Sequence, residues 1–101
     1  MPSFRYSQTA DSDLDGIAEY TVLQFGENQA RAYRAMIDQS ANTIAEYPEV
    51  GRSYETRRGR VLRKHNVGEH ALFYVPQADG VLIVSVLHLK SDFDRYLDDG
   101  F

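Results

Sequence analysis

Two apolar stripes at helical spacing, separated by one glycine, constrain the fold of this chain more than any other feature. Gly26 lies between them, and glycine readily takes the left-handed conformation that ends a helix. The second stripe stops at Tyr47-Pro48, because proline disfavours helix in the residue before it. The pattern predicts two antiparallel helices with a shared apolar face. The first stripe contains Leu14, Ile17, Ala18, Thr21, Val22 and Phe25, and the second contains Ala30, Tyr33, Met36, Ile37, Ser40, Ala41 and Ile44.

The residues before the first stripe predict how its helix begins. Phe4, Arg5 and Tyr6 favour a short strand. Ser7 or Thr9 can then supply a side-chain oxygen that caps the free amides of the first helical turn. Negative charge is favourable near a helix N-terminus, and three aspartates follow there: Asp11, Asp13 and Asp15.

The second half of the chain has the pattern of a strand meander. Residues 48–59 predict an irregular connection, punctuated by glycine, and residues 61–65 form a possible strand. Residues 71–75 are apolar on both faces, and so are residues 81–89. Asp79-Gly80 between them is a favoured hairpin pair. These segments predict three antiparallel strands, with residues 81–89 in the interior of the sheet.

The order of these elements predicts an α+β fold. A short strand and an α-hairpin precede the three-stranded meander, and the helices should pack on one face of the sheet. Residues 92–98 favour a short terminal helix capped by Ser91. With 101 residues, the chain has length for one domain, which we place at residues 1–101.

Composition excludes several classes of protein and site. The chain has no cysteine, so it can form neither a disulfide framework nor a thiolate metal site. No metal-ligand spacing of histidines and carboxylates and no glycine-rich phosphate loop is present, so we expect no metal and no cofactor. The N-terminus has no apolar leader, and the longest apolar run, residues 81–89, is too short to span a bilayer. We therefore expect a cytoplasmic protein that does not enter a membrane.

Positive charge is concentrated at the junction between the helical half and the strand-rich half. Between residues 52 and 64 only Glu55 opposes six of the eleven positive charges, although the net charge of the chain is −4. Arginine can form two hydrogen bonds with one carboxylate or phosphate, so this density favours a partner contact over an ordinary solvated face. Tyr54 is the only aromatic residue among these charges, which gives little support to stacking on single-stranded nucleic acid. The six residues are Arg52, Arg57, Arg58, Arg60, Arg63 and Lys64.

Several short pieces, in a defined order, carry a family resemblance. They begin with Ser7, Ala10, Asp13-Leu14 and Ile17, and continue with Phe25-Gly26-Glu27, Ala30 and the run from Tyr47 to Arg52. Val67-Gly68-Glu69-His70, Leu72-Phe73-Tyr74, Val84 to His88, Lys90, Asp92 and Arg95 complete them. From Phe4 to about Leu97 the chain resembles the ParE/RelE superfamily of toxins from bacterial toxin–antitoxin pairs, and it is most similar to the ParE branch.

The resemblance implies a toxin that a cognate, ParD-like antitoxin holds silent in a hetero-oligomer. Such partners commonly lay a helix and an extended segment across the helical hairpin and a sheet edge. ParE-type members are similar to one another in poisoning DNA gyrase, whereas RelE-type members cut mRNA on the ribosome. We expect a gyrase inhibitor that acts by binding. A ribosome-dependent mRNA endonuclease and an inactive binding module remain as alternatives.

A ribonuclease would need an acid, a base and cations around the phosphate. His65, His88 and Tyr96 are the candidates for the acid and the base, but each has an ordinary structural interpretation. His70, beside Glu69, is expected to make a capping or hairpin contact.

The last cations of the chain argue against RNA as a direct ligand. Lys90 and Arg95 are surrounded by Asp92, Asp94, Asp98 and Asp99, and this acidic tail would repel a phosphate backbone. Direct nucleic-acid binding is therefore not expected, and we predict no catalytic residue. The predicted contacts with target or antitoxin are the six basic residues of 52–64 together with His88 and Lys90.

Overall fold

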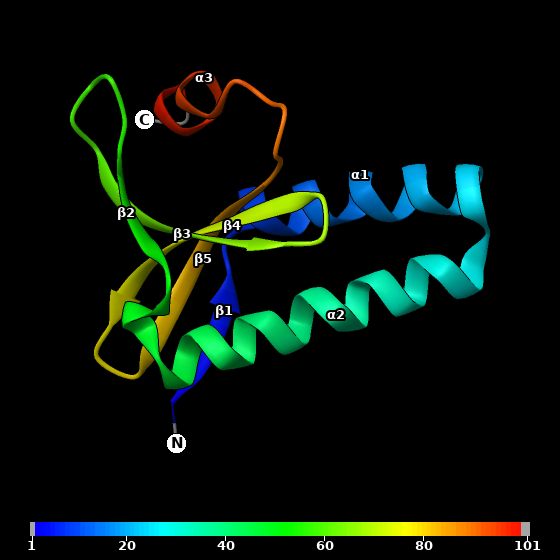
Figure 1. The fold of residues 1–101 in the computed structure, drawn as a ribbon, viewed down its shortest axis with the longest axis horizontal. Helices are drawn as coiled ribbons and strands as arrows, with labels where there is room; N and C mark the ends of the chain where they lie inside the picture. Colours follow the sequence, from blue (N-terminus) through cyan, green and yellow to red (C-terminus); the bar gives the residue numbers. More distant parts are fainter. Residues whose placement is uncertain (1, 100–101) are drawn as a thin grey trace.

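The computed structural model describes residues 2–99, which form an α+β fold (Figure 1). A five-stranded sheet carries a long helical hairpin and a short terminal helix. The elements in chain order are β1 (Ser3–Tyr6), α1 (Gln8–Phe25), α2 (Glu27–Glu46), the 3-10 turn η1 (Pro48–Val50), β2 (Arg52–Glu55), β3 (Val61–Val67), β4 (His70–Gln77), β5 (Gly80–His88) and α3 (Phe93–Asp98).

Capping residues place the two long helices as their sequence predicts. Ser7 caps α1: its Oγ accepts a hydrogen bond from the Ala10 amide at 3.0 Å. The same hydroxyl donates to the Val84 carbonyl at 2.7 Å, which fixes the start of α1 against β5. Gly26 separates α1 from α2 with a φ of 92°, a conformation that glycine adopts without strain. Helix α2 ends at Glu46, before Tyr47-Pro48.

The sheet has the order β1-β5-β4-β3-β2, with β1 parallel to β5 and the other pairs antiparallel. Strand β5 is flanked by β1 and β4, so the prediction of an interior last strand is confirmed. The prediction of an irregular connection over residues 48–59 was wrong in part, because residues 52–55 form the edge strand β2. This strand has no apolar alternation to reveal it, and its pairing with β3 defines it instead.

The two faces of the sheet hold two separate apolar clusters. The α-hairpin covers one face, as predicted, and its core includes Leu14, Ile37 and Leu72. Helix α3 covers the other face, where Leu97 and Phe93 pack with Phe73 and Leu62. Helix α3 begins after Asp92, whose carboxylate accepts from the Arg95 amide, so the prediction of Ser91 as the cap was wrong by one residue. None of the helices within residues 2–99 is long and apolar enough to cross a membrane.

The helical hairpin extends beyond the sheet, to the right in Figure 1. Helix α1 buries Ala10, Leu14 and Thr21, but its C-terminal end leaves Leu23 and Phe25 exposed by 76% and 67%. The shared apolar face of the hairpin is therefore buried over only part of the first stripe. Its exposed members are Ala18, Val22 and Phe25, and in the second stripe Met36 is also exposed.

The hydroxyl of Tyr74 fixes the connection between α2 and the sheet. Tyr74 is fully buried in β4, yet its hydroxyl donates to the Pro48 carbonyl at 2.6 Å and accepts from the Gly51 amide at 2.9 Å. A side chain on Gly51 would collide with this hydroxyl, because an added Cβ would lie 2.4 Å from it. The tyrosine thus supplies hydrogen-bond partners for two backbone groups of residues 48–51, a segment that pairs with no strand within residues 2–99.

Replacing Tyr74 with phenylalanine should lower the free energy of unfolding by about 1–3 kcal/mol, because it leaves a buried carbonyl and amide without a partner. Thermal and urea denaturation would measure the loss. Tyr47→Phe is the matched control, since Tyr47 is 62% exposed, and it should change the stability by less than about 0.5 kcal/mol. Equal stability of the two variants would contradict this role for the Tyr74 hydroxyl.

Candidate functional site

The structure divides the basic segment among three places. Arg52 and Lys64 are cross-strand partners on the face of the sheet that carries α3. Arg63 directly precedes Lys64 in β3 and therefore points to the opposite face, where its Nη1 donates to the Gly51 carbonyl at 2.6 Å. The turn between β2 and β3 holds the remaining three residues: Arg57, Arg58 and Arg60.

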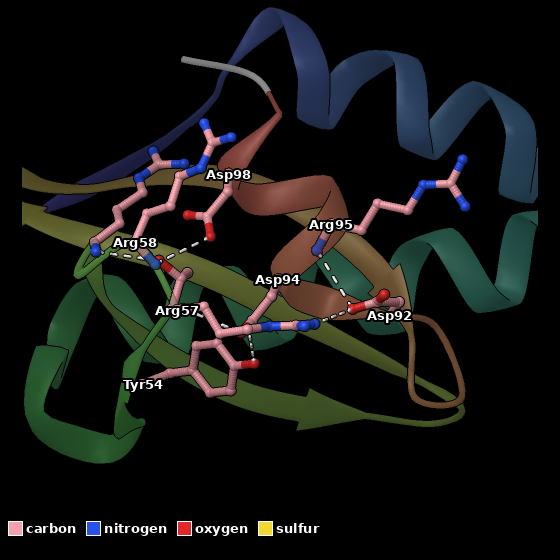
Figure 2. A network of polar contacts seen from close by, with 9 residues as sticks. Tyr54, Arg57, Arg58, Asp92, Asp94, Arg95 and Asp98 are labelled. Carbon is pink, nitrogen blue, oxygen red and sulfur yellow. Dashed lines mark hydrogen bonds and ion pairs between the residues drawn. The ribbon is translucent and has the colours of Figure 1, made fainter.

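Arg57 binds the start of α3 (Figure 2). Its Nε donates to Asp94 at 3.0 Å, its Nη2 donates to Asp92 at 3.3 Å, and its backbone amide also donates to Asp94 at 3.1 Å. The Tyr54 hydroxyl donates to the other oxygen of Asp94. The hydrogen bond from Tyr54, together with those from Arg57, holds the pKa of Asp94 below its usual value.

The other two arginines of this turn also contact the C-terminal helix. The Arg58 amide donates to Asp98 at 3.3 Å, and Arg60 Nη1 donates to the Leu97 carbonyl at 2.9 Å. Burial lowers the pKa of Arg60. We call the contacts of Arg57, Arg58 and Arg60 with residues 92–98 the α3 clamp. In the α3 clamp, Asp92, Asp94 and Asp98 accept hydrogen bonds from Arg57 and Arg58.

Fewer of the predicted contact residues present their charge to solvent than the sequence indicates. Lys64 Nζ lies 5.3 Å from the centre of the Phe93 ring, a cation–π contact. Arg52 is exposed on the edge strand β2, and Lys90 is exposed after β5. Within the structure, Arg57, Arg60 and Arg63 have a structural role.

A groove of about 730 Å³ opens under the overhanging part of the hairpin, and Tyr96 of α3 is among the residues that line it. Helices α1 and α2 form its walls, and the turn between β3 and β4 and the end of β5 form its floor. Its lining residues include Gly16, Tyr20, Tyr33, His70, His88 and Tyr96.

Two histidines lie side by side at the floor of this groove. His70 and His88 are cross-strand partners, with ring centroids 5.3 Å apart. The Tyr33 hydroxyl lies 2.6 Å from His70 Nδ1 and accepts a hydrogen bond from the Glu69 amide at 3.1 Å. Burial lowers the pKa of His70, and the neighbouring His88 lowers it further. Burial raises the pKa of Tyr33.

The residues considered for ribonuclease chemistry are not all in one place. His88 and Tyr96 line the groove. His65 instead lines a separate hollow of about 280 Å³ beside Arg52 and Lys64. In residues 2–99 no group of three or more histidines and carboxylates is arranged to hold a metal ion.

Sequence reasoning missed the contribution of two groove residues. Tyr33 fits the apolar stripe of α2, and nothing in the sequence shows that its hydroxyl reaches the turn between β3 and β4. His70 was expected to make a contact within the hairpin, and its contact with His88 does join β4 to β5. Gly16, a glycine in the middle of a helix, was the available signal of an open surface, since nothing lies within 4 Å of an added Cβ there.

Comparisons with known proteins agree with this fold. The family model for the ParE toxin of the type II toxin–antitoxin system parDE matches residues 4–93. Toxin ParE1 of Mycobacterium tuberculosis is 35% identical over 99 residues, which cover 94% of this chain and 99% of that protein. Toxin ParE1 of Caulobacter vibrioides is 34% identical over 97 residues, covering 96% of this chain and 99% of that protein.

A solved structure shows the same fold at lower sequence similarity. It is described as the chromosomal ParDE TA system from P. aeruginosa, and one of its chains superposes with a TM-score of 0.71 at 17% identity. The superposition covers 89% of this chain and 98% of that chain.

Substituting Asp94 should loosen the α3 clamp in a pH-dependent way. Because the pKa of Asp94 is lowered in the folded protein, its stabilisation is present above the pKa of the unfolded chain, about 3.9, and is lost as the pH falls through the folded value. Asp94→Asn should therefore lower the Tm at pH 7, and the difference from the parent protein should shrink below about pH 4. Thermal denaturation from pH 2 to pH 7 would measure this difference.

Glu55→Gln provides the control for Asp94→Asn. Glu55 is exposed on β2 and forms no ion pair within residues 2–99. Its substitution should leave the Tm nearly unchanged. A loss in Asp94→Asn that is the same at pH 3 and pH 7 would show that the charge of Asp94 does not stabilise the clamp.

Proposed function

Since the chain belongs to the family of ParE toxins of type II toxin–antitoxin systems, we propose that a ParD-like antitoxin neutralises it and that it inhibits DNA gyrase in the cytoplasm by binding. The groove under the α-hairpin is the observation that carries this proposal. It supplies a concave site for a helical partner. Inhibition by binding requires no reaction of the toxin itself.

The groove has the properties of a seat for an amphipathic helix. Its walls include the exposed ring of Tyr20, which is 62% accessible, and the exposed Phe25 beside it. Large apolar side chains that gather at a concave surface are typical of a protein interface. We propose that a helix of the antitoxin occupies the groove and that an extended segment follows the free edge of the sheet at β2.

The α3 clamp supports binding over phosphodiester cleavage. Arg57 is engaged with Asp92 and Asp94, and Arg60 is engaged with a backbone carbonyl of α3. A nuclease needs such cations free at the scissile phosphate. Among the predicted contact residues, Arg52, Arg58 and Lys90 are exposed and their charged groups have no partner within residues 2–99, so these three are available to gyrase.

A gyrase supercoiling assay tests the proposed target. The purified toxin should inhibit supercoiling of relaxed plasmid, and an equimolar amount of the antitoxin encoded beside it should restore the activity. Normal supercoiling at excess toxin would contradict gyrase as the target. New cleavage sites in translated mRNA, lost in His88→Ala and Tyr96→Phe, would instead support the endonuclease, whose two candidates share the groove.

Substitution of Gly16 tests the seat of the antitoxin. Gly16→Trp places a large ring in the groove, and it should not harm the fold, because Gly16 is an exposed helical residue with open space around it. We expect it to weaken antitoxin binding at least tenfold in calorimetry and to leave the toxin active in cells that produce antitoxin. Gly16→Ala is the control, and it should bind normally and be more stable by about 0.5–1 kcal/mol. Normal affinity in Gly16→Trp would place the antitoxin elsewhere.

A further inference from the structure

We propose that the partner helix places an oxygen acceptor, a side-chain carboxylate or amide, over the histidine pair at the floor of the groove. The inference rests on the proposed function, because it assumes that the antitoxin occupies the groove. It adds the chemistry by which His70 and His88 would select that partner. Within residues 2–99, two ring nitrogens of the pair are already engaged in hydrogen bonds, and two are not.

The hydrogen bonds of His88 fix its neutral tautomer. The Lys90 backbone amide lies 3.1 Å from His88 Nδ1, and a backbone N–H can only donate. Nδ1 is therefore an acceptor without a proton, so Nε2 carries the hydrogen of the neutral ring.

His70 is held in the same tautomer by Tyr33. The Tyr33 hydroxyl accepts from the Glu69 amide and has one proton of its own to donate. His70 Nδ1, at 2.6 Å, is a much closer acceptor for that proton than the Val67 carbonyl at 3.4 Å. Nδ1 of His70 is thus an acceptor as well, and Nε2 carries the hydrogen.

Both Nε2–H groups are left without a hydrogen-bond partner within residues 2–99. Glu69 Oε2 lies 4.0 Å from His88 Nε2, which is too long for a hydrogen bond, and the Glu69 side chain is 83% exposed. Every buried side-chain nitrogen and oxygen in this part of the chain has a partner, so Nε2 of His70 must be reached by solvent. Asp13, which also lines the groove, already accepts from the Ser85 hydroxyl and the Val86 amide.

A partner that fills the groove changes the hydrogen bonding of these two Nε2–H donors. An apolar helix seated over them would remove their water, and a buried N–H without an acceptor is strongly unfavourable. A lysine or arginine over the pair would bring further donors where both Nδ1 acceptors are already used. An oxygen acceptor on the partner satisfies the exposed donors, and partners without one are rejected.

Two substitutions of His88 test the proposal, with binding of the fluorescently labelled antitoxin from the adjacent reading frame as the readout. His88→Leu removes the donor, while His88→Gln retains an N–H at the end of the side chain. Both lose the contact with the Lys90 amide, so that loss cancels in the comparison. We expect His88→Leu to weaken binding about five- to tenfold and His88→Gln to stay within about threefold of the parent protein.

The outcome separates this inference from the proposed function. The proposed oxygen acceptor would be contradicted by parent-like affinity in His88→Leu. An equal loss of affinity in His88→Gln and His88→Leu would also contradict it. If Gly16→Trp abolishes binding while His88→Leu does not weaken it, the antitoxin occupies the groove without using the histidines. If Gly16→Trp leaves binding unchanged, the groove is not the antitoxin site. The proposed seat of the antitoxin is then wrong, and the inference about the histidines is wrong with it. Thermal denaturation of each variant confirms that it is folded.

Discussion

The helical hairpin is packed on the sheet over only part of its length, and the functional surface follows from this constraint. Helix α1 has 18 residues and α2 has 20, so they extend for about 27 and 30 Å. The buried residues of α1 are Ala10, Leu14 and Thr21, and the turn at Gly26 projects beyond the sheet (Figure 1). The overhang leaves apolar side chains uncovered, because no strand lies beneath them. A monomer rarely keeps such a patch beside a groove unless a partner covers it.

Two tyrosine hydroxyls hold the hairpin in this position, one at each end of its contact with the sheet. Tyr74 binds the segment that leaves α2, and Tyr33 binds the turn between β3 and β4. Gly68 in that turn has a φ of 56°, and an added Cβ would lie 2.7 Å from the Tyr33 hydroxyl, so the turn needs a glycine for both reasons. The same hydroxyl orients His70. The packing that positions the hairpin therefore also sets the hydrogen-bonding character of the groove floor.

Regular periodicity made most of the fold predictable from the sequence, whereas long-range pairing did not. The hairpin, the Ser7 cap and the interior position of β5 follow from local patterns and are confirmed. Strand β2 could not be predicted, since four residues with one aromatic carry little signal and only the pairing with β3 defines them. The groove escaped prediction for a related reason: a stripe such as Leu14 to Phe25 shows which face is apolar, but not where the sheet beneath it ends.

The basic segment illustrates how tertiary contacts change the meaning of a charge pattern. Six cations in an otherwise acidic chain suggest an anionic partner molecule. Two acidic residues of the same chain, Asp92 and Asp94, already bind Arg57. Asp94 lies far from Arg57 in the sequence and joins it through the packing of Phe93 and Leu97 on the sheet. Ion pairs of this kind are exposed and screened, so their main effect is to orient α3 rather than to stabilise the fold. The cations of the predicted contact set that stay exposed without a side-chain partner within residues 2–99 are therefore few, namely Arg52, Arg58 and Lys90, and the groove with its pair of histidines lies apart from Arg52 and Arg58.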